Sequence, residues 1–198
     1  VMGNIKIAIA GVGNCASSLV QGLEYYRSHR YNGQIETLGL MHFDLGGYTP
    51  ENIEVVAAFD VDRRKVGKPL QEAVFAKPNC TQVFQAELSS FSVRVLMGEV
   101  LDGISDHMKE YPAERTFIVS EEKPCNIEEA LRESKAEILL NYMPVGSEEA
   151  TRFYARCCLN TGVSFINCMP TFIVSDPEWG RQFQKKGIPI IGDDIKSQ

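Results

Sequence analysis

A short apolar run near the start of the chain, residues 5–10, breaks into the pattern Gly11-x-Gly13-x-x-Ala16 and then continues as an apparent helix. Gly11 permits a tight turn, Gly13 lets the backbone approach a phosphate, and Ala16 is small enough for a helix to pack on a strand. Unpaired N–H groups and the positive end of the helix dipole would face an anion. The pattern predicts a turn that binds a dinucleotide pyrophosphate; the alternative is an ordinary tight turn between strand and helix.

A carboxylate ends the second apolar run, which we expect to form a strand over residues 53–61. Asp60 lies at the end of this run, where a carboxylate would bind the ribose hydroxyls of NAD and repel the 2′-phosphate of NADP. It follows the glycines by more than the usual distance of roughly 20 residues, and the irregular stretch 28–52 accounts for the excess. The alternative is that Asp60 caps a helix or is a solvated carboxylate.

Two later strands end alike, in Asn-Tyr-Met-Pro at 141–144 and Asn-Cys-Met-Pro at 167–170. An asparagine there could hydrogen-bond a nicotinamide or a sugar hydroxyl, or it could only satisfy loop backbone groups. The last predicted strand leads to Asp193, Asp194 and Lys196. A lysine could hold a phosphate, stabilise an enolate or move a proton if its pKa is lowered, or it could be a surface residue. Two carboxylates without a third ligand predict no metal site.

Apolar runs and amphipathic stretches alternate along the chain, and this alternation predicts the elements that position these residues. We expect strands at 5–10, 53–61, 92–97, 115–119, 137–142, 163–167 and 188–191, and helices at 14–27, 63–75, 102–110, 128–135, 147–160 and 176–186. Such alternation predicts a doubly wound α/β fold, a parallel sheet covered on both faces, with ligands at the carboxyl ends of the strands. We expect one Rossmann-type dinucleotide-binding domain over 1–198, with a long insertion at 28–52.

Composition narrows the classes of partner and compartment. The net charge of −6 argues against broad nucleic-acid binding, which needs a basic face. No apolar stretch approaches the roughly 20 residues that cross a membrane, and the N-terminus lacks the features of a signal peptide. The six cysteines are scattered without a C-x-x-C pair, as in proteins of a reducing cytoplasm. We therefore expect a cytoplasmic protein without nucleic-acid or membrane partners.

Four segments, taken in order along nearly the whole chain, resemble the myo-inositol-1-phosphate synthase family in its actinobacterial and archaeal branch. They are residues 11–26, 57–62, 142–149 and the final Gly-Asp-Asp-Ile-Lys-Ser-Gln at 192–198. The resemblance implies NAD-dependent conversion of D-glucose 6-phosphate to 1L-myo-inositol 1-phosphate by a homo-oligomer, a tetramer, in inositol and phospholipid biosynthesis. The steps implied are oxidation, enolisation, aldol cyclisation and reduction.

The resemblance also implies roles for individual residues. Lys196 and Asp194 would be catalytic, and Asn167 and Ser197 would bind substrate. The residues implied to bind NAD are Gly11, Gly13, Asn14, Cys15, Ala16, Asp60, Tyr142 and Pro144.

In this family a catalytic and oligomerisation region with further lysines follows the last of these segments, whereas this chain stops at Gln198. We therefore expect residues 1–198 to supply the NAD site and to turn over little or no glucose 6-phosphate alone. Two alternatives remain open: a simple NAD-dependent dehydrogenase, which would accumulate NADH, and a non-catalytic NAD-binding module, which would bind NAD without turnover.

Overall fold

The computed structural model describes residues 3–28, 30–31, 34–35, 39–89, 92–104, 108 and 110–195. Its central feature is a parallel sheet in the order β5-β4-β1-β6-β7-β8. The strands are β1 (Ile5–Ala10), β4 (Ile53–Asp60), β5 (Val95–Met97), β6 (Ile138–Asn141), β7 (Ser164–Asn167) and β8 (Ile190–Ile191). The chain moves outward from β1 to one edge and then returns to fill the other, as doubly wound folds do, and the predicted fold class is confirmed.

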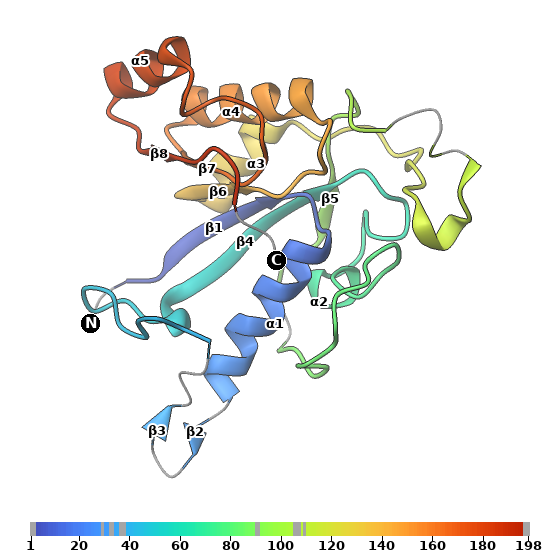
Figure 1. Ribbon diagram of the computed structural model, residues 1–198, viewed down its shortest axis with the longest axis vertical. Helices are drawn as coiled ribbons and strands as arrows, with labels where there is room; N and C mark the ends of the chain where they lie inside the picture. The colour runs from blue at the N-terminus through green and yellow to red at the C-terminus, as the bar shows by residue number, and fades with distance from the viewer. Residues whose placement is uncertain are drawn as a thin grey trace.

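Helices cover both faces of this sheet, as Figure 1 shows. Helices α1 (Asn14–Ser28) and α2 (Leu70–Ala73) lie on one face. The opposite face carries α3 (Ile127–Ser134), α4 (Glu148–Thr161) and α5 (Pro177–Lys186). Because every central strand is buried on two sides, its residues alternate between two apolar clusters: Ile7 and Ile9 face α1, whereas Ala8 and Ala10 face α3 and α4.

Residues suited to helix ends stop and start the helices on the second face. The side chain of Asn126 accepts the N–H of Glu129 at 3.2 Å at the start of α3, and Asp176 accepts the N–H of Glu178 at 2.7 Å at the start of α5. Gly162 and Gly187 end α4 and α5 in the left-handed conformation, which glycine adopts without strain. The limits predicted for these helices agree with the structure to within one residue.

The strand predicted at 115–119 is wrong, because side chains take up the backbone groups that a sheet would need. The guanidinium of Arg64 donates to the carbonyls of Ala113 (2.5 Å) and Thr116 (2.6 Å). The N–H of Ile118 donates to the carboxylate of Asp62 at 3.1 Å. Its first residue, Arg115, instead ends the short helix η3 (Ala113–Arg115), and the segment makes one isolated bridge, between Val119 and Asp62.

The helix predicted over 63–75 is also wrong for most of its length. Only α2, Leu70–Ala73, is helical, because Gly67 adopts a φ of +76° and Pro69 interrupts the backbone just before it. In the stretch 28–52 the structure has the short antiparallel pair β2 (Arg30–Tyr31) and β3 (Gln34–Ile35) and the 3-10 turn η1 (Pro50–Asn52). The helix predicted at 102–110 falls partly outside the described residues.

Candidate functional site

A cavity of about 370 Å³ opens at the carboxyl end of the sheet. Its walls come from the turn between β1 and α1, the end of β4, and the segments that follow β5, β6, β7 and β8. This is the place where doubly wound sheets bind their ligands, at the point where the strand order reverses on either side of β1. Five of the eight predicted cofactor ligands, Gly11, Gly13, Asn14, Cys15 and Asp60, line the first part of the cavity.

The turn after β1 brings the backbone very close to the neighbouring strand. Gly11 has a φ of +93°, and a Cβ built on it would lie 2.7 Å from the carbonyl oxygen of Tyr142. Its N–H donates to the carbonyl of Phe59 at 2.9 Å. No residue with a side chain fits this position without a shift of the β6 end, so the glycine sets the turn.

The second glycine of the turn faces open space. A Cβ on Gly13 would have no protein atom within 4 Å, and the residue lines the cavity. The first helical hydrogen bond of α1 runs from the N–H of Ser17 to the carbonyl of Gly13, at 2.9 Å. Within the described part of the chain, the N–H groups of residues 13–16 have no protein acceptor. Four donors at the positive end of a helix therefore lack an acceptor, and those of Gly13, Asn14 and Cys15, which line the cavity, remain for an anion.

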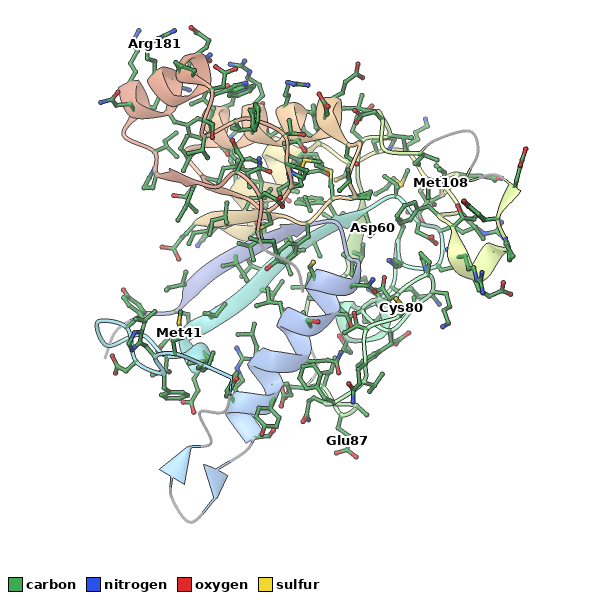
Figure 2. All side chains as sticks on the ribbon, in the orientation of Figure 1. Met41, Asp60, Cys80, Glu87, Met108 and Arg181 are labelled. Atoms are coloured by element: carbon green, nitrogen blue, oxygen red, sulfur yellow. The ribbon has the colours of Figure 1, made fainter. Side chains whose placement is uncertain are left out.

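The remaining residues of this helix start have separate tasks. Ala16 is fully buried and packs α1 against the sheet, which agrees with the reason for a small residue there. Asn14 is exposed, and its side chain accepts the N–H of Cys80 at 2.8 Å. The hydroxyl of Thr81 donates to the carbonyl of Asn14 at 3.0 Å. Figure 2 shows Cys80 on the segment that passes the start of α1. No motif in the sequence predicted this wall of the site.

Asp60 lies at the carboxyl end of β4, as Figure 2 shows, with 8% of its side chain exposed. One carboxylate oxygen accepts the N–H of Val12 and the other accepts the N–H groups of Val61 and Asp62, each at 2.8 Å. A carboxylate offers about four acceptor positions, so about one position remains for a ligand hydroxyl. Capping of backbone N–H groups and binding of a ribose by Asp60 are therefore compatible in this geometry.

A buried lysine under the turn is the feature that no sequence motif predicted. The side chain of Lys65 has no exposed surface, and its Nζ donates to the carbonyl of Val12 (2.7 Å) and to Oδ1 of Asn79 (2.9 Å). The Asn79 amide donates to the same carbonyl of Val12 at 3.1 Å. Burial lowers the pKa of Lys65, although the nearby Asp60 and Asp62 act to raise it. In the sequence this lysine lies in a run of charged residues that resembles a solvated surface.

The middle of the cavity is formed by the segments after β6 and β7. Tyr142 and Pro144, after β6, and Cys168, after β7, all line it. Burial raises the pKa of the Tyr142 hydroxyl well above its ordinary value, with smaller contributions from Cys168 and Cys15. Burial also raises the pKa of Cys168 to about 11. Both groups therefore remain protonated at neutral pH, and the tyrosine is a hydrogen-bond donor beside the helix start.

The two asparagines of the repeated strand ends bind one another rather than the cavity. Both are fully buried, and the amide of Asn141 donates to Oδ1 of Asn167 at 2.9 Å and to the hydroxyl of Thr151 at 3.1 Å. Asn167 in turn donates to Oδ1 of Asp193 at 2.8 Å and to the carbonyl of Thr171 at 2.6 Å. Asn167 does not line the cavity; in this geometry it positions the segment that follows β8.

Asp193 fastens that segment to the loop after β7. Its two oxygens accept the N–H groups of Ile173 (3.0 Å), Val174 (3.0 Å) and Ser175 (3.1 Å). Burial acts to raise the pKa of Asp193, but the hydrogen bonds from Asn167 and from these N–H groups outweigh it and lower the pKa. With Asp193 held in this way, Asp194 reaches the cavity wall. Lys196 and Ser197, predicted to be catalytic and substrate-binding, lie outside the described residues.

A further carboxylate closes the other end of the cavity. Asp102 accepts the N–H of Glu149 at 2.7 Å and that of Ala150 at 3.0 Å, so it caps the start of α4 from the segment after β5. Of the described residues that line the cavity, four are acidic and one, Lys65, is a cation; the acidic ones are Asp60, Glu99, Asp102 and Asp194. The start of α1 is therefore the part of the described wall that favours an anion.

The described residues contain neither a metal-binding cluster nor a membrane helix. No group of three or more His, Cys, Asp or Glu side chains among them is arranged to hold a metal ion. No helix in that part of the chain combines the length and the apolar character needed to cross a membrane.

Comparison with known proteins agrees with the motifs. The chain is 47% identical over 196 residues to the inositol-3-phosphate synthase of Mycolicibacterium smegmatis, covering 99% of this chain and 52% of that protein. It is 48% identical over 194 residues to the inositol-3-phosphate synthase of Corynebacterium glutamicum, covering 98% of this chain and 51% of that protein. No protein-family model matches the chain.

Two solved structures share the fold over 98% of this chain. The crystal structure of Ari2 superposes with a TM-score of 0.79 at 36% identity, covering 55% of that chain. A myo-inositol-1-phosphate synthase-related protein from Thermotoga maritima superposes with a TM-score of 0.72 at 22% identity, covering 56% of that chain. The chain thus spans about half the length of the relatives it matches. Over nearly its whole length the chain is therefore similar to about half of the inositol-3-phosphate synthases, the family that the four motifs resemble.

Proposed function

We propose that this chain binds NAD, with the diphosphate on the N–H groups at the start of α1. The supporting observation is that the donors of residues 13–16 have no acceptor among the described residues and that Gly13 leaves open space above them. Residues next to this turn also suit parts of the cofactor. The remaining acceptor position of Asp60 suits a ribose hydroxyl, and the protonated hydroxyl of Tyr142 suits a polar group of the cofactor.

The proposed reaction rests on the relatives and on the motifs. We infer that the whole protein converts D-glucose 6-phosphate to 1L-myo-inositol 1-phosphate, because its relatives are inositol-3-phosphate synthases and its four motifs resemble that family. When bound, NAD would accept and return a hydride within each cycle. The contribution of the described residues is to bind and orient it: the helix start holds the diphosphate, Asp60 the ribose, and Tyr142 and Pro144 one side of the cavity.

The substrate end of the proposed site lies at the segment that follows β8. Asp194 is placed at the cavity wall by the hydrogen bonds of Asp193, and Lys196 follows two residues later in the sequence. We propose that Asp194 and Lys196 act at the reacting sugar, with Ser197 beside them, because negative charge develops on oxygen in the enolisation step and an ammonium stabilises it. Asn167 would act indirectly, by holding Asp193.

The cofactor part of this proposal is tested by Asp60→Asn, which keeps one acceptor oxygen and removes the negative charge. We expect NAD affinity to fall about tenfold and the preference for NAD over NADP to shrink, because the carboxylate no longer repels a 2′-phosphate. Isothermal titration with both cofactors measures this, and Glu133→Gln, an exposed carboxylate on α3, is the control. An NAD affinity unchanged within threefold, about 0.7 kcal/mol, would show that Asp60 does not bind the ribose.

A further inference from the structure

The backbone of Val12, between the two glycines of the turn, is held at both ends by charged side chains. Its N–H donates to Oδ2 of Asp60 at 2.8 Å, and its carbonyl accepts from Nζ of Lys65 at 2.7 Å. Asn79 adds a second donor to that carbonyl at 3.1 Å and accepts from Lys65 at 2.9 Å. The orientation of the turn therefore depends on one anion and one cation that lie beneath it.

The two charges also pair with each other. Nζ of Lys65 lies 3.9 Å from Oδ2 of Asp60, the lysine side chain has no exposed surface, and the carboxylate is 8% exposed. Both residues line the cavity. Charges removed from water interact strongly, and removing one partner of such a pair leaves the other uncompensated.

This arrangement answers an electrostatic problem that the proposed NAD site creates. A carboxylate that holds the ribose and accepts the N–H of Val12 lies directly under a turn that must receive two phosphate charges. Asp60 alone would repel the diphosphate, and the described cavity wall contains three further acidic residues. Because Lys65 is the one cation among the described lining residues, its charge is the available compensation for Asp60.

We infer that Lys65 is a positioning residue for the diphosphate: it holds the carbonyl of Val12 and its charge cancels that of Asp60 beneath the bound dinucleotide. This inference rests on the proposed NAD site and adds to it the means by which an acidic cavity accepts an anionic cofactor. It predicts that the contribution of Lys65 to NAD affinity depends on whether the carboxylate of Asp60 is present.

A double-mutant cycle tests this dependence, using wild type, Lys65→Met, Asp60→Asn and the double variant. The dissociation constants of NAD and of adenosine, which carries a ribose and no phosphate, are measured by NMR titration. Lys65→Met should weaken NAD binding at least tenfold when Asp60 is present and threefold or less when it is combined with Asp60→Asn. Adenosine binding should change threefold or less in either background. Lys68→Met, at an exposed position three residues away, should leave both ligands unaffected.

Each other result decides against the inference. An equal loss of NAD affinity in both backgrounds would show that Lys65 does not compensate Asp60, and an equal loss of NAD and adenosine would show general damage to the site. If Lys65→Met does not fold, Lys65→Gln decides, because it keeps a donor and removes the charge; unchanged NAD binding in that variant would overturn the role of the charge. Failure of the wild-type chain to bind NAD would overturn both proposals together.

Discussion

The two glycines of the turn after β1 have different physical roles, although they look equivalent in the motif. Gly11 is required by the protein, since a Cβ there would lie 2.7 Å from the carbonyl oxygen of Tyr142 and the residue has a φ of +93°. Gly13 meets no protein atom within 4 Å, so the fold does not require a glycine there, and in the proposed binding mode the diphosphate does. A folding requirement and a proposed binding requirement therefore lie within three residues of each other.

Alanine substitutions at the two positions should have different effects, one on stability and the other on NAD binding. Gly11→Ala should lower the free energy of unfolding by about 2–4 kcal/mol, because an alanine is strained at this positive φ and its Cβ must displace the end of β6. Gly13→Ala should change that free energy by about 0.5 kcal/mol or less and should weaken NAD binding at least tenfold. Urea unfolding and calorimetric titration measure the two effects. A strongly destabilised Gly13→Ala, or one with unchanged affinity, would contradict this division.

Among single residues, the sequence predicts those that act through backbone geometry better than those that act through a partner. The glycines, Ala16 and Asp60 follow from a motif and its position after a strand, and each lies where the motif requires. Lys65 does not follow from any pattern, because its importance comes from Val12 and Asn79, which are far from it in the sequence. Asn167 resembled a cavity ligand because it ends a strand, yet both its polar atoms are used internally.

Among the elements, side chains acting as acceptors for backbone N–H groups hold the irregular parts of the site together. Asp102 caps α4, Asp60 fixes the turn, and Asp193 fastens the end of β8 to the loop after β7. The regular strands were predictable because each is an apolar run bounded by turn residues. The segment 115–119 has a similar run but is bound by Arg64 and Asp62, a tertiary effect that periodicity does not contain.

The loop held by Asp193 provides a test with a definite pH dependence. The pKa of Asp193 is lowered in the folded state, so its contribution to stability is present above the unfolded value of about 3.9 and is lost as the pH falls through the lower folded value. Asp193→Asn should lower the free energy of unfolding by about 1–3 kcal/mol at pH 7, because its amide faces backbone N–H groups.

Below about pH 4 the difference between Asp193→Asn and wild type should shrink, since the wild-type carboxyl then also becomes protonated. Urea unfolding at pH 7, 5 and 3 measures this difference. The control Glu133→Gln should differ from wild type in free energy of unfolding by the same small amount at each pH. A difference that stays constant with pH would contradict the role assigned to the Asp193 charge.

In the molecule as a whole, the described residues supply the proposed dinucleotide site and little that would hold a sugar phosphate. Their cavity wall has four acidic residues, and its single cation, Lys65, is already bound to Val12 and Asn79. The chain spans about half the length of the synthases it matches. Anionic substrates need cations placed at the phosphate and at the developing oxyanion.

We therefore expect the 198-residue chain alone to bind NAD and to form little or no inositol 1-phosphate from glucose 6-phosphate. Phosphorus NMR of the product and absorbance of NADH, followed together, measure this. Formation of inositol 1-phosphate would contradict the expectation, and steady accumulation of NADH would favour a simple dehydrogenase.

The unpaired amides at the start of α1 are the proposed binding site for the diphosphate of NAD. They can be observed individually by titrating the ¹⁵N-labelled chain with NAD and following its amide resonances. We expect the N–H signals of residues 13–16 to shift together, with one dissociation constant, while those of α3 on the other face of the sheet do not shift. Unchanged signals at residues 13–16 at saturating NAD, or shifts confined to another part of the molecule, would show that the diphosphate does not bind there.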